Sequence, residues 1–128
     1  MDTEIRVLIA DDESIIREGI KCLFDWESLG YTIAGEAANG ETAYQQILAL
    51  QPDIVLLDIR MPGMNGLELQ RELLDRRCTL PVVVITGHGD VSSARDAFRA
   101  DAIDFLEKPL TGETLRGCLK KWVKSPAA

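Results

Sequence analysis

The chain has 128 residues, a length that suits one folded domain with a single hydrophobic core. Hydrophobic residues make up 46% of it and charged residues 27%, which is typical of a folded protein and argues against disorder. The formal net charge of -7 argues against direct binding to nucleic acid, because phosphate backbones require basic patches.

Features of membrane and secreted proteins are absent from the sequence. No apolar run approaches the roughly 20 residues that a membrane span needs. The N-terminal stretch MDTEIRVLIADDES lacks a basic segment before its apolar run, and Asp11 and Asp12 end that run early, so no secretory signal is expected. The wide spacing of Cys22, Cys78 and Cys118 favours reduced thiols over a disulfide framework or a zinc site. We therefore expect a cytoplasmic protein.

Apolar runs alternate with amphipathic segments along the whole chain. The runs predict buried strands over residues 5–10, 31–37, 53–58, 81–86 and 103–107. Apolar residues at helical spacing predict helices over residues 13–24, 41–50, 66–76, 92–100 and 111–124. Strand–helix repeats with short connections imply an α/β fold, in which a doubly wound parallel sheet is covered by helices on both faces. We expect one domain over residues 1–124, with residues 125–128 as the start of a linker or a cloning remnant.

Three of these helices begin at a residue suited to capping. Asn39 precedes the second helix, and Asn65 precedes the third, with Glu68 three residues further on. Thr111 opens the last helix, where Glu113 in the first turn suits the helix dipole. These signals predict where the helices start.

Polar side chains follow the strands at their carboxyl ends, where sheets of this kind collect functional groups. Asp11 and Asp12 follow the first strand, and Asp58 ends the third. Thr86 ends the fourth strand, and Lys108 follows the fifth. Neighbouring carboxylates repel one another, and a divalent cation that prefers oxygen ligands removes the repulsion; we expect Mg²⁺, with Mn²⁺ as the alternative. A carboxylate beside Mg²⁺ with a lysine in reach suits phosphoryl transfer, with Asp58 as the nucleophile.

Each of these residues also has a purely structural interpretation. Asp58 alone could cap the turn that follows it, and Lys108 could be a surface lysine. Asp11 and Asp12 could complement the dipole of the first helix, and Asp12 could cap that helix while it also binds metal. Thr86 could be an ordinary threonine at a strand end. Their combination at one edge of the sheet favours the functional interpretation.

The segments ADDES, VLLDIRMPGMNGLEL, VVVITGHGD and DFLEKPL, in this order, resemble the receiver domain of two-component response regulators. The resemblance extends from residue 5 to about residue 124. It implies the flavodoxin-like, CheY-like fold, with five parallel strands in the order 2-1-3-4-5. It also implies a signalling domain rather than an enzyme, which accepts a phosphoryl group from a sensor histidine kinase.

The same resemblance implies a role for each motif residue. Asp58 is the phosphoacceptor, and Lys108 binds the phosphoryl oxygens. Asp12 binds Mg²⁺ directly, while Asp11 acts through water or as a supporting charge. The backbone carbonyl of Arg60 is a further metal ligand, and Asp58 completes the metal set.

Further residues are implicated in switching and in signal lifetime. Thr86 and Phe105 are the implied switch pair, although Phe105 also suits a plain core position because it lacks a hydroxyl group. Arg60 and His88 would flank the phosphoryl group and modulate its lifetime; His88 alternatively is a generic loop histidine. The implied output and dimerisation face spans residues 92–124.

The motifs are similar to two groups of relatives, and one segment departs from the usual sequence of the family. DWESLGYTIAGEAANG is similar to receivers that precede AraC-type DNA-binding domains, whereas the later motifs are similar to FixJ-type receivers. Two explanations of this mixture are open: a mixed lineage and an engineered chimera. Ala100-Asp101-Ala102 stands where family members usually carry Gly-Ala, and glycine suits the left-handed position after a helix.

We expect a phosphoacceptor module that regulates transcription through a separate output domain, without direct nucleic acid or membrane binding of its own. A stand-alone receiver that acts by protein docking is the alternative. A phosphatase with an aspartate nucleophile usually has a second carboxylate two residues later, where Arg60 stands. A nucleotide-binding or flavin-binding protein needs a glycine-rich phosphate loop, where DDESIIREG stands.

Overall fold

The computed structural model describes residues 5–23, 25–58, 66–75, 81–86, 104–107 and 110–122. Its strands are β1 (Ile5–Ala10), β2 (Tyr31–Ala37), β3 (Ile54–Asp58), β4 (Val82–Thr86) and β5 (Asp104–Glu107). Its helices are α1 (Ser14–Lys21), the short 3₁₀ helix η1 (Glu27–Leu29), α2 (Gly40–Leu50), α3 (Gly66–Asp75) and α5 (Gly112–Trp122).

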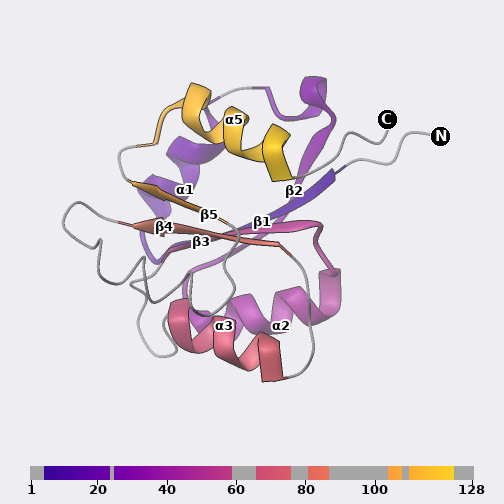
Figure 1. Ribbon diagram of the computed structural model, residues 1–128, viewed down its shortest axis with the longest axis vertical. Helices are drawn as coiled ribbons and strands as arrows, with labels where there is room; N and C mark the ends of the chain where they lie inside the picture. The colour runs from indigo at the N-terminus through magenta and orange to yellow at the C-terminus, as the bar shows by residue number, and fades with distance from the viewer. Residues whose placement is uncertain are drawn as a thin grey trace.

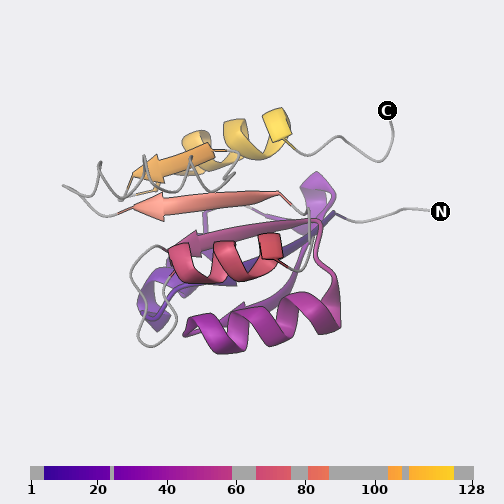
Figure 2. The same cartoon turned by 60° about the horizontal axis from the view of Figure 1, so that its bottom comes forward.

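The described strands form one sheet in the order β2-β1-β3-β4-β5. Every neighbouring pair is parallel, and the arrows of the sheet in Figure 2 accordingly point the same way. Helices α1 and α5 lie on one face of the sheet, and α2 and α3 lie on the other (Figure 1). The predicted fold class and strand order are confirmed. None of the helices in the described part of the chain is long and apolar enough to cross a membrane.

The core has two halves, one on each face of the sheet. Side chains alternate along a strand, so Leu8 and Ala10 of β1 join the half beneath α2 and α3, while Val7 and Ile9 join the half beneath α1 and α5. Both faces of the central strands are therefore buried. This explains why those strands appear in the sequence as continuous apolar runs rather than as an alternating pattern.

Helix α1 ends earlier than the sequence predicts, and the chain forms η1 before it enters β2. Trp26 lies in the core, where it contacts Tyr31 edge to face at 6.0 Å between ring centroids. Its indole N–H donates to the carbonyl of Ile20 in α1 at 3.3 Å. Gly30, with φ of 88°, then turns the chain in the left-handed conformation that favours glycine. Burial of the tryptophan therefore sets this connection.

Two helices begin with a side-chain cap, at places where the sequence predicted a helix to start. The Asn39 side chain accepts from the Thr42 amide at 2.8 Å, although α2 begins at Gly40, one residue earlier than expected. The Thr111 hydroxyl accepts from the Thr114 amide at 3.1 Å at the start of α5. Asn65 lies outside the described residues.

Gly35 occupies a crowded position where β2 packs against β1 and α2. The pairing of β1 with β2 shifts register between Val7 and Leu8, which brings Gly35 opposite Leu8. A Cβ atom at Gly35 would lie 2.5 Å from Gln46 Oε1, 2.9 Å from Leu50 Cδ1 and 3.2 Å from Leu8 Cδ1. The Gln46 amide is held there by a 2.6 Å hydrogen bond from its Nε2 to the carbonyl of Glu36. A side chain at this position would have to displace the ends of the Gln46 and Leu50 side chains.

Replacing Gly35 by alanine is expected to lower the free energy of unfolding by about 1–3 kcal/mol, because the added methyl group would overlap the Gln46 and Leu50 side chains. Gly117→Ala is the matched control. No atom lies within 4 Å of its added Cβ, and glycine inside a helix is unfavourable, so this variant should gain about 0.5–1 kcal/mol. Urea unfolding measures both. A Gly35→Ala variant as stable as the unmodified protein would contradict the steric argument.

Candidate functional site

Two buried carboxylates lie at the carboxyl edge of the sheet, at the ends of neighbouring strands. Ala10 of β1 is the register partner of Leu57 of β3. The next residues on the two strands, Asp11 and Asp58, therefore follow side by side. Asp11 is 0% exposed and Asp58 is 4% exposed. Carboxylates are rarely buried to this extent unless they are paired or coordinate a cation, so this edge is the candidate site.

The loop after β1 adds two more carboxylates. The Asp11 amide donates to the carbonyl of Ala37 at 3.0 Å, and the Asp11 Oδ1 atom accepts from the Glu13 amide at 2.9 Å. Asp12 and Glu13 are exposed. Carboxylate oxygens of Asp11, Asp12 and Glu13 lie within 4.8 Å of one another. The loop thus presents a cluster of hard oxygen donors beside Asp58.

This geometry excludes one of the open interpretations of Asp12 and adds a residue to the carboxylate cluster. Asp12 does not cap α1, because Glu13 occupies the N-cap position in an extended conformation, and its side chain makes no capping hydrogen bond. Asp11, rather than Asp12, satisfies an amide at this turn, since its Oδ1 accepts the Glu13 N–H. The Asp12 carboxylate is therefore not needed to cap α1. Glu13 itself was not among the predicted metal residues, although the run Asp-Asp-Glu was visible in the sequence.

The donors fit the expected metal. Mg²⁺ prefers carboxylate and carbonyl oxygens, and it usually retains several waters, which an open cluster beside a buried carboxylate permits. Mn²⁺ accepts the same donors. Asp11, Asp12, Glu13 and Asp58 are the described residues that could hold it.

The backbone of β4 and β5 extends the same edge. Ile85 is the register partner of Asp58, so Thr86, which ends β4, lies one position beyond the level of Asp58. Phe105 lies within β5, paired with Val84. The expected switch residues therefore lie on the two strands that continue the sheet beyond β3.

Three of the predicted site residues lie outside the described residues. These are Arg60, which follows β3, His88, which follows β4, and Lys108, which follows β5. Lys108 comes directly after Glu107, the register partner of Thr86. The predicted helix over residues 92–100 also lies outside the described part of the chain.

An ion-pair network between α1 and β2 borders the carboxylate loop. The Arg17 Nε atom donates to Glu36 Oε1 at 3.1 Å, and the Lys21 Nζ atom donates to Glu36 Oε2 at 2.7 Å. The hydrogen bond from Lys21 is the main reason that the pKa of Glu36 lies below its ordinary value of 4.5, although burial opposes the shift. Hydrogen bonds to Glu18 and Glu36 raise the pKa of Lys21. This network was not predicted, because nothing in the sequence pairs α1 with the end of β2.

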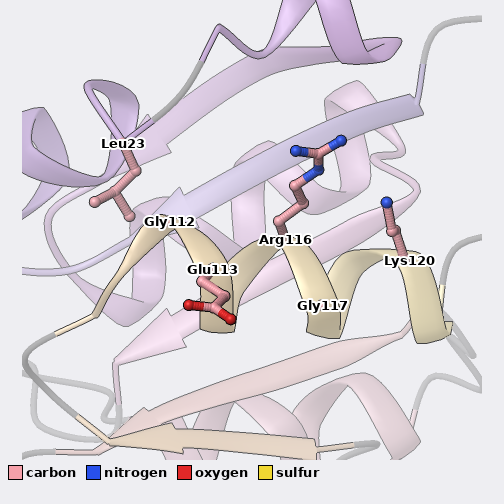
Figure 3. Close-up of a pocket in the computed structure, with 6 residues that line it drawn as sticks. All are labelled: Leu23, Gly112, Glu113, Arg116, Gly117 and Lys120. Atoms are coloured by element: carbon pink, nitrogen blue, oxygen red, sulfur yellow. The ribbon is translucent and has the colours of Figure 1, made fainter.

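A separate groove lies between the end of α1 and helix α5 (Figure 3), and its lining does not include the carboxylates of the candidate site. Its volume is about 550 Å³, and it is lined by Leu23, Gly112, Glu113, Arg116, Gly117 and Lys120. The Arg116 and Lys120 side chains project from the same side of α5 (Figure 3). The groove and the carboxylate edge are therefore distinct features.

Comparison with protein families matches residues 7–120 to the response regulator receiver domain. The chain belongs to the response regulator receiver family. The observed strand order β2-β1-β3-β4-β5 is the one that the resemblance to this family implied. The chain is thus a receiver domain of a two-component response regulator, which is a signalling domain.

Relatives of this receiver domain include transcriptional regulators. The transcriptional regulatory protein FixJ of Bradyrhizobium diazoefficiens is 31% identical over 130 residues, which cover 100% of this chain and 62% of FixJ. The uncharacterized transcriptional regulatory protein YesN of Bacillus subtilis is 36% identical, over 91% of this chain and 32% of YesN. Among solved structures, the REC domain of AraT, a response regulator from Geobacillus stearothermophilus, superposes with a TM-score of 0.86 at 37% identity, covering 93% of this chain and 92% of that domain.

The receiver domain is shorter than its curated relatives. It spans between 25% of the C4-dicarboxylate transport regulator DctD of Pseudomonas aeruginosa and 62% of FixJ. FixJ, which represents one of the two groups that the sequence motifs indicated, is among the relatives.

Proposed function

We propose that this receiver domain takes a single phosphoryl group onto Asp58 from a phosphohistidine of a sensor histidine kinase, in a Mg²⁺-dependent reaction. The observation that carries the proposal is the burial of Asp58 beside the Asp11–Glu13 loop on the neighbouring strand. A single carboxylate fixed at a rigid strand end is suited to act as a nucleophile, because its geometry is set before the donor arrives.

In the proposed reaction, a carboxylate oxygen of Asp58 attacks the phosphorus atom, the P–N bond to the donor imidazole breaks, and the imidazole leaves. Asp12 would hold Mg²⁺ directly, with Asp11, Asp58 and the carbonyl of Arg60 completing its protein contacts. Bound there, Mg²⁺ would neutralise the negative charge on the transferred phosphoryl group. Mn²⁺ is the alternative ion.

Two further residues would act on the phosphoryl group itself. Lys108 would pair with its oxygens, and the hydroxyl of Thr86 would donate to it after transfer. The position of Thr86 at the end of β4, next to β3, supports this role. The outcome is an acyl phosphate whose formation and slow hydrolysis constitute all of the chemistry.

Phosphorylation at Asp58 has a direct test. Incubation with Mg²⁺ and acetyl phosphate should raise the intact mass by one phosphoryl group, and Asp58→Asn should abolish the increase. Asp75→Asn, which changes an exposed aspartate at the end of α3, is the control and should behave like the unmodified protein. Repeated turnover of small phosphate esters would instead support an aspartate-nucleophile phosphatase.

We further propose that Arg60 and His88 set the lifetime of the acyl phosphate, since each follows a site strand by two residues and would flank the phosphoryl group. Bulky side chains at these places would exclude or position the attacking water. This proposal rests on sequence position, because both residues lie outside the described part of the chain.

Arg60→Ala and His88→Ala should each change the decay rate of phosphorylated protein several-fold, followed by intact mass after removal of acetyl phosphate. Arg71→Ala, on the exposed side of α3, serves as the control. Equal decay rates in all three variants would remove Arg60 and His88 from the mechanism.

The output is proposed to be a change of packing on the face formed by residues 92–124, biased by Thr86 and Phe105. Relatives named as transcriptional regulatory proteins support control of transcription. We propose that an output domain makes the contact with DNA and that the protein acts in the cytoplasm. If phosphorylation makes this face complementary to the same face of a second receiver, the two receivers would form a dimer with a two-fold axis.

Light scattering should show the mass rising from that of the 14.1 kDa monomer toward twice that value when Mg²⁺ and beryllofluoride, an acyl-phosphate analogue, are added. Asp58→Asn is the control and should stay monomeric. An unchanged mass would favour the alternative, in which the receiver acts by docking to a different protein.

A further inference from the structure

Arg17 links the carboxylate loop to two other elements. Its Nη1 atom donates to the backbone carbonyl of Asp11 at 2.5 Å, and its Nε atom donates to Glu36 Oε1 at 3.1 Å. Its side chain is 17% exposed. One guanidinium group on α1 therefore bonds both the loop after β1 and the end of β2.

The contact to Asp11 completes the support of its backbone. The Asp11 N–H already donates to Ala37 at the end of β2 at 3.0 Å, so the amide and the carbonyl of this residue are both fixed. The Asp11 side chain in turn accepts the Glu13 N–H at 2.9 Å. Three bonds around one buried residue thus fix the backbone at the start of the Asp11–Glu13 loop.

The position of Arg17 on α1 explains its reach. Side chains of a helix lean toward its N-terminus, and Arg17 lies one turn into α1, so its guanidinium returns to the loop from which the helix starts. The planar guanidinium donates in fixed directions, which lets one group hold a carbonyl and a carboxylate together.

The partner of Arg17 is itself fixed. Glu36 also accepts from Lys21 at 2.7 Å, and Lys21 pairs with Glu18 on the same helix at 2.7 Å. The lowered pKa of Glu36 keeps it ionised around neutral pH, so its charge offsets that of Arg17. The guanidinium therefore brings little net charge to the cation site, and its contribution is geometric.

We propose that Arg17 is a positioning residue for the metal site: its bonds to the Asp11 carbonyl and the Glu36 carboxylate hold the Asp11–Glu13 loop in the conformation that receives Mg²⁺. The proposal rests on the proposed function, which assigns Mg²⁺ to this loop. Groups that orient metal ligands typically contribute about tenfold or more to metal affinity.

The test is the dissociation constant for Mg²⁺, measured by isothermal titration calorimetry and, with Mn²⁺ as the probe, by the electron paramagnetic resonance signal of the free ion. Arg17→Ala should weaken binding by about tenfold. Arg17→Lys keeps the charge but loses the planar two-way contact, so it should also weaken binding. Lys21→Ala is the matched control, because it removes an ion pair from the same helix and leaves the Arg17 bond to Asp11; its affinity should stay within about twofold of the unmodified protein.

The direction of the change in Mg²⁺ affinity distinguishes a positioning role of Arg17 from a purely electrostatic one. Arg17→Ala removes a positive charge near a cation site, so a purely electrostatic role predicts tighter Mg²⁺ binding, whereas positioning predicts weaker binding. Unchanged or tighter binding in a folded Arg17→Ala protein, checked by urea unfolding, overturns the proposal. If Arg17→Ala does not fold, Arg17→Lys decides in the same way, with unchanged affinity overturning it.

Phosphorylation by acetyl phosphate gives a second readout. In Arg17→Ala, the Mg²⁺ concentration for half-maximal rate should rise by about tenfold, while saturating Mg²⁺ restores most of the maximal rate. Failure of the unmodified protein to bind Mg²⁺ or to gain a phosphoryl group would reject the proposed function. An unmodified protein that does both, beside an Arg17→Ala variant of equal affinity, rejects the role of Arg17 alone.

Discussion

The site depends on the parallel pairing of β1 with β3. This pairing places Asp11 and Asp58 next to each other at strand ends that are buried on both faces. Both carboxylates are almost fully buried, and burying an ionised carboxylate is costly unless it is paired or binds a cation. A cation at this edge would offset the cost of that burial, which makes the strand ends a suitable place for a metal. The neighbouring carboxylates of Asp12 and Glu13 strengthen that preference.

The elements around this pairing have separate tasks. The apolar residues of the central strands make the edge rigid, because helices pack on both faces. Strand β2 contributes no predicted metal ligand, but Ala37 and Glu36 at its end fix the loop after β1, the first directly and the second through Arg17. Helix α1 thus supports the site as well as the core. In our proposal, the receiver controls the position of its carboxylates through residues that do not touch the phosphoryl group.

Much of this arrangement could be predicted from the sequence. The alternation of apolar runs and helical patterns predicted the fold class, because buried parallel strands and their crossovers permit few topologies. The strand order came from the family resemblance. Placing Asp11, Asp12 and Asp58 at strand ends needed only the strand boundaries. The sequence also allowed Asp12 to cap α1, but the N-cap position is held by Glu13, and the Glu13 amide donates to Asp11. The connection through Trp26 and η1 was also not predicted, because it follows from the burial of one ring.

The sequence by itself determined which chemistry is available. The apolar strands and the carboxylates at their ends can be recognised from residue types and spacing, because each strand is specified by residues close together in the sequence. Only the tertiary structure decided how those groups are held. The contacts of Arg17 with Asp11 and Glu36, and of Gly35 with Gln46, join segments of the chain whose proximity arises from the packing of α1 and α2 against the sheet. Such contacts leave no periodic signal in the sequence, because each depends on where two separately formed elements meet.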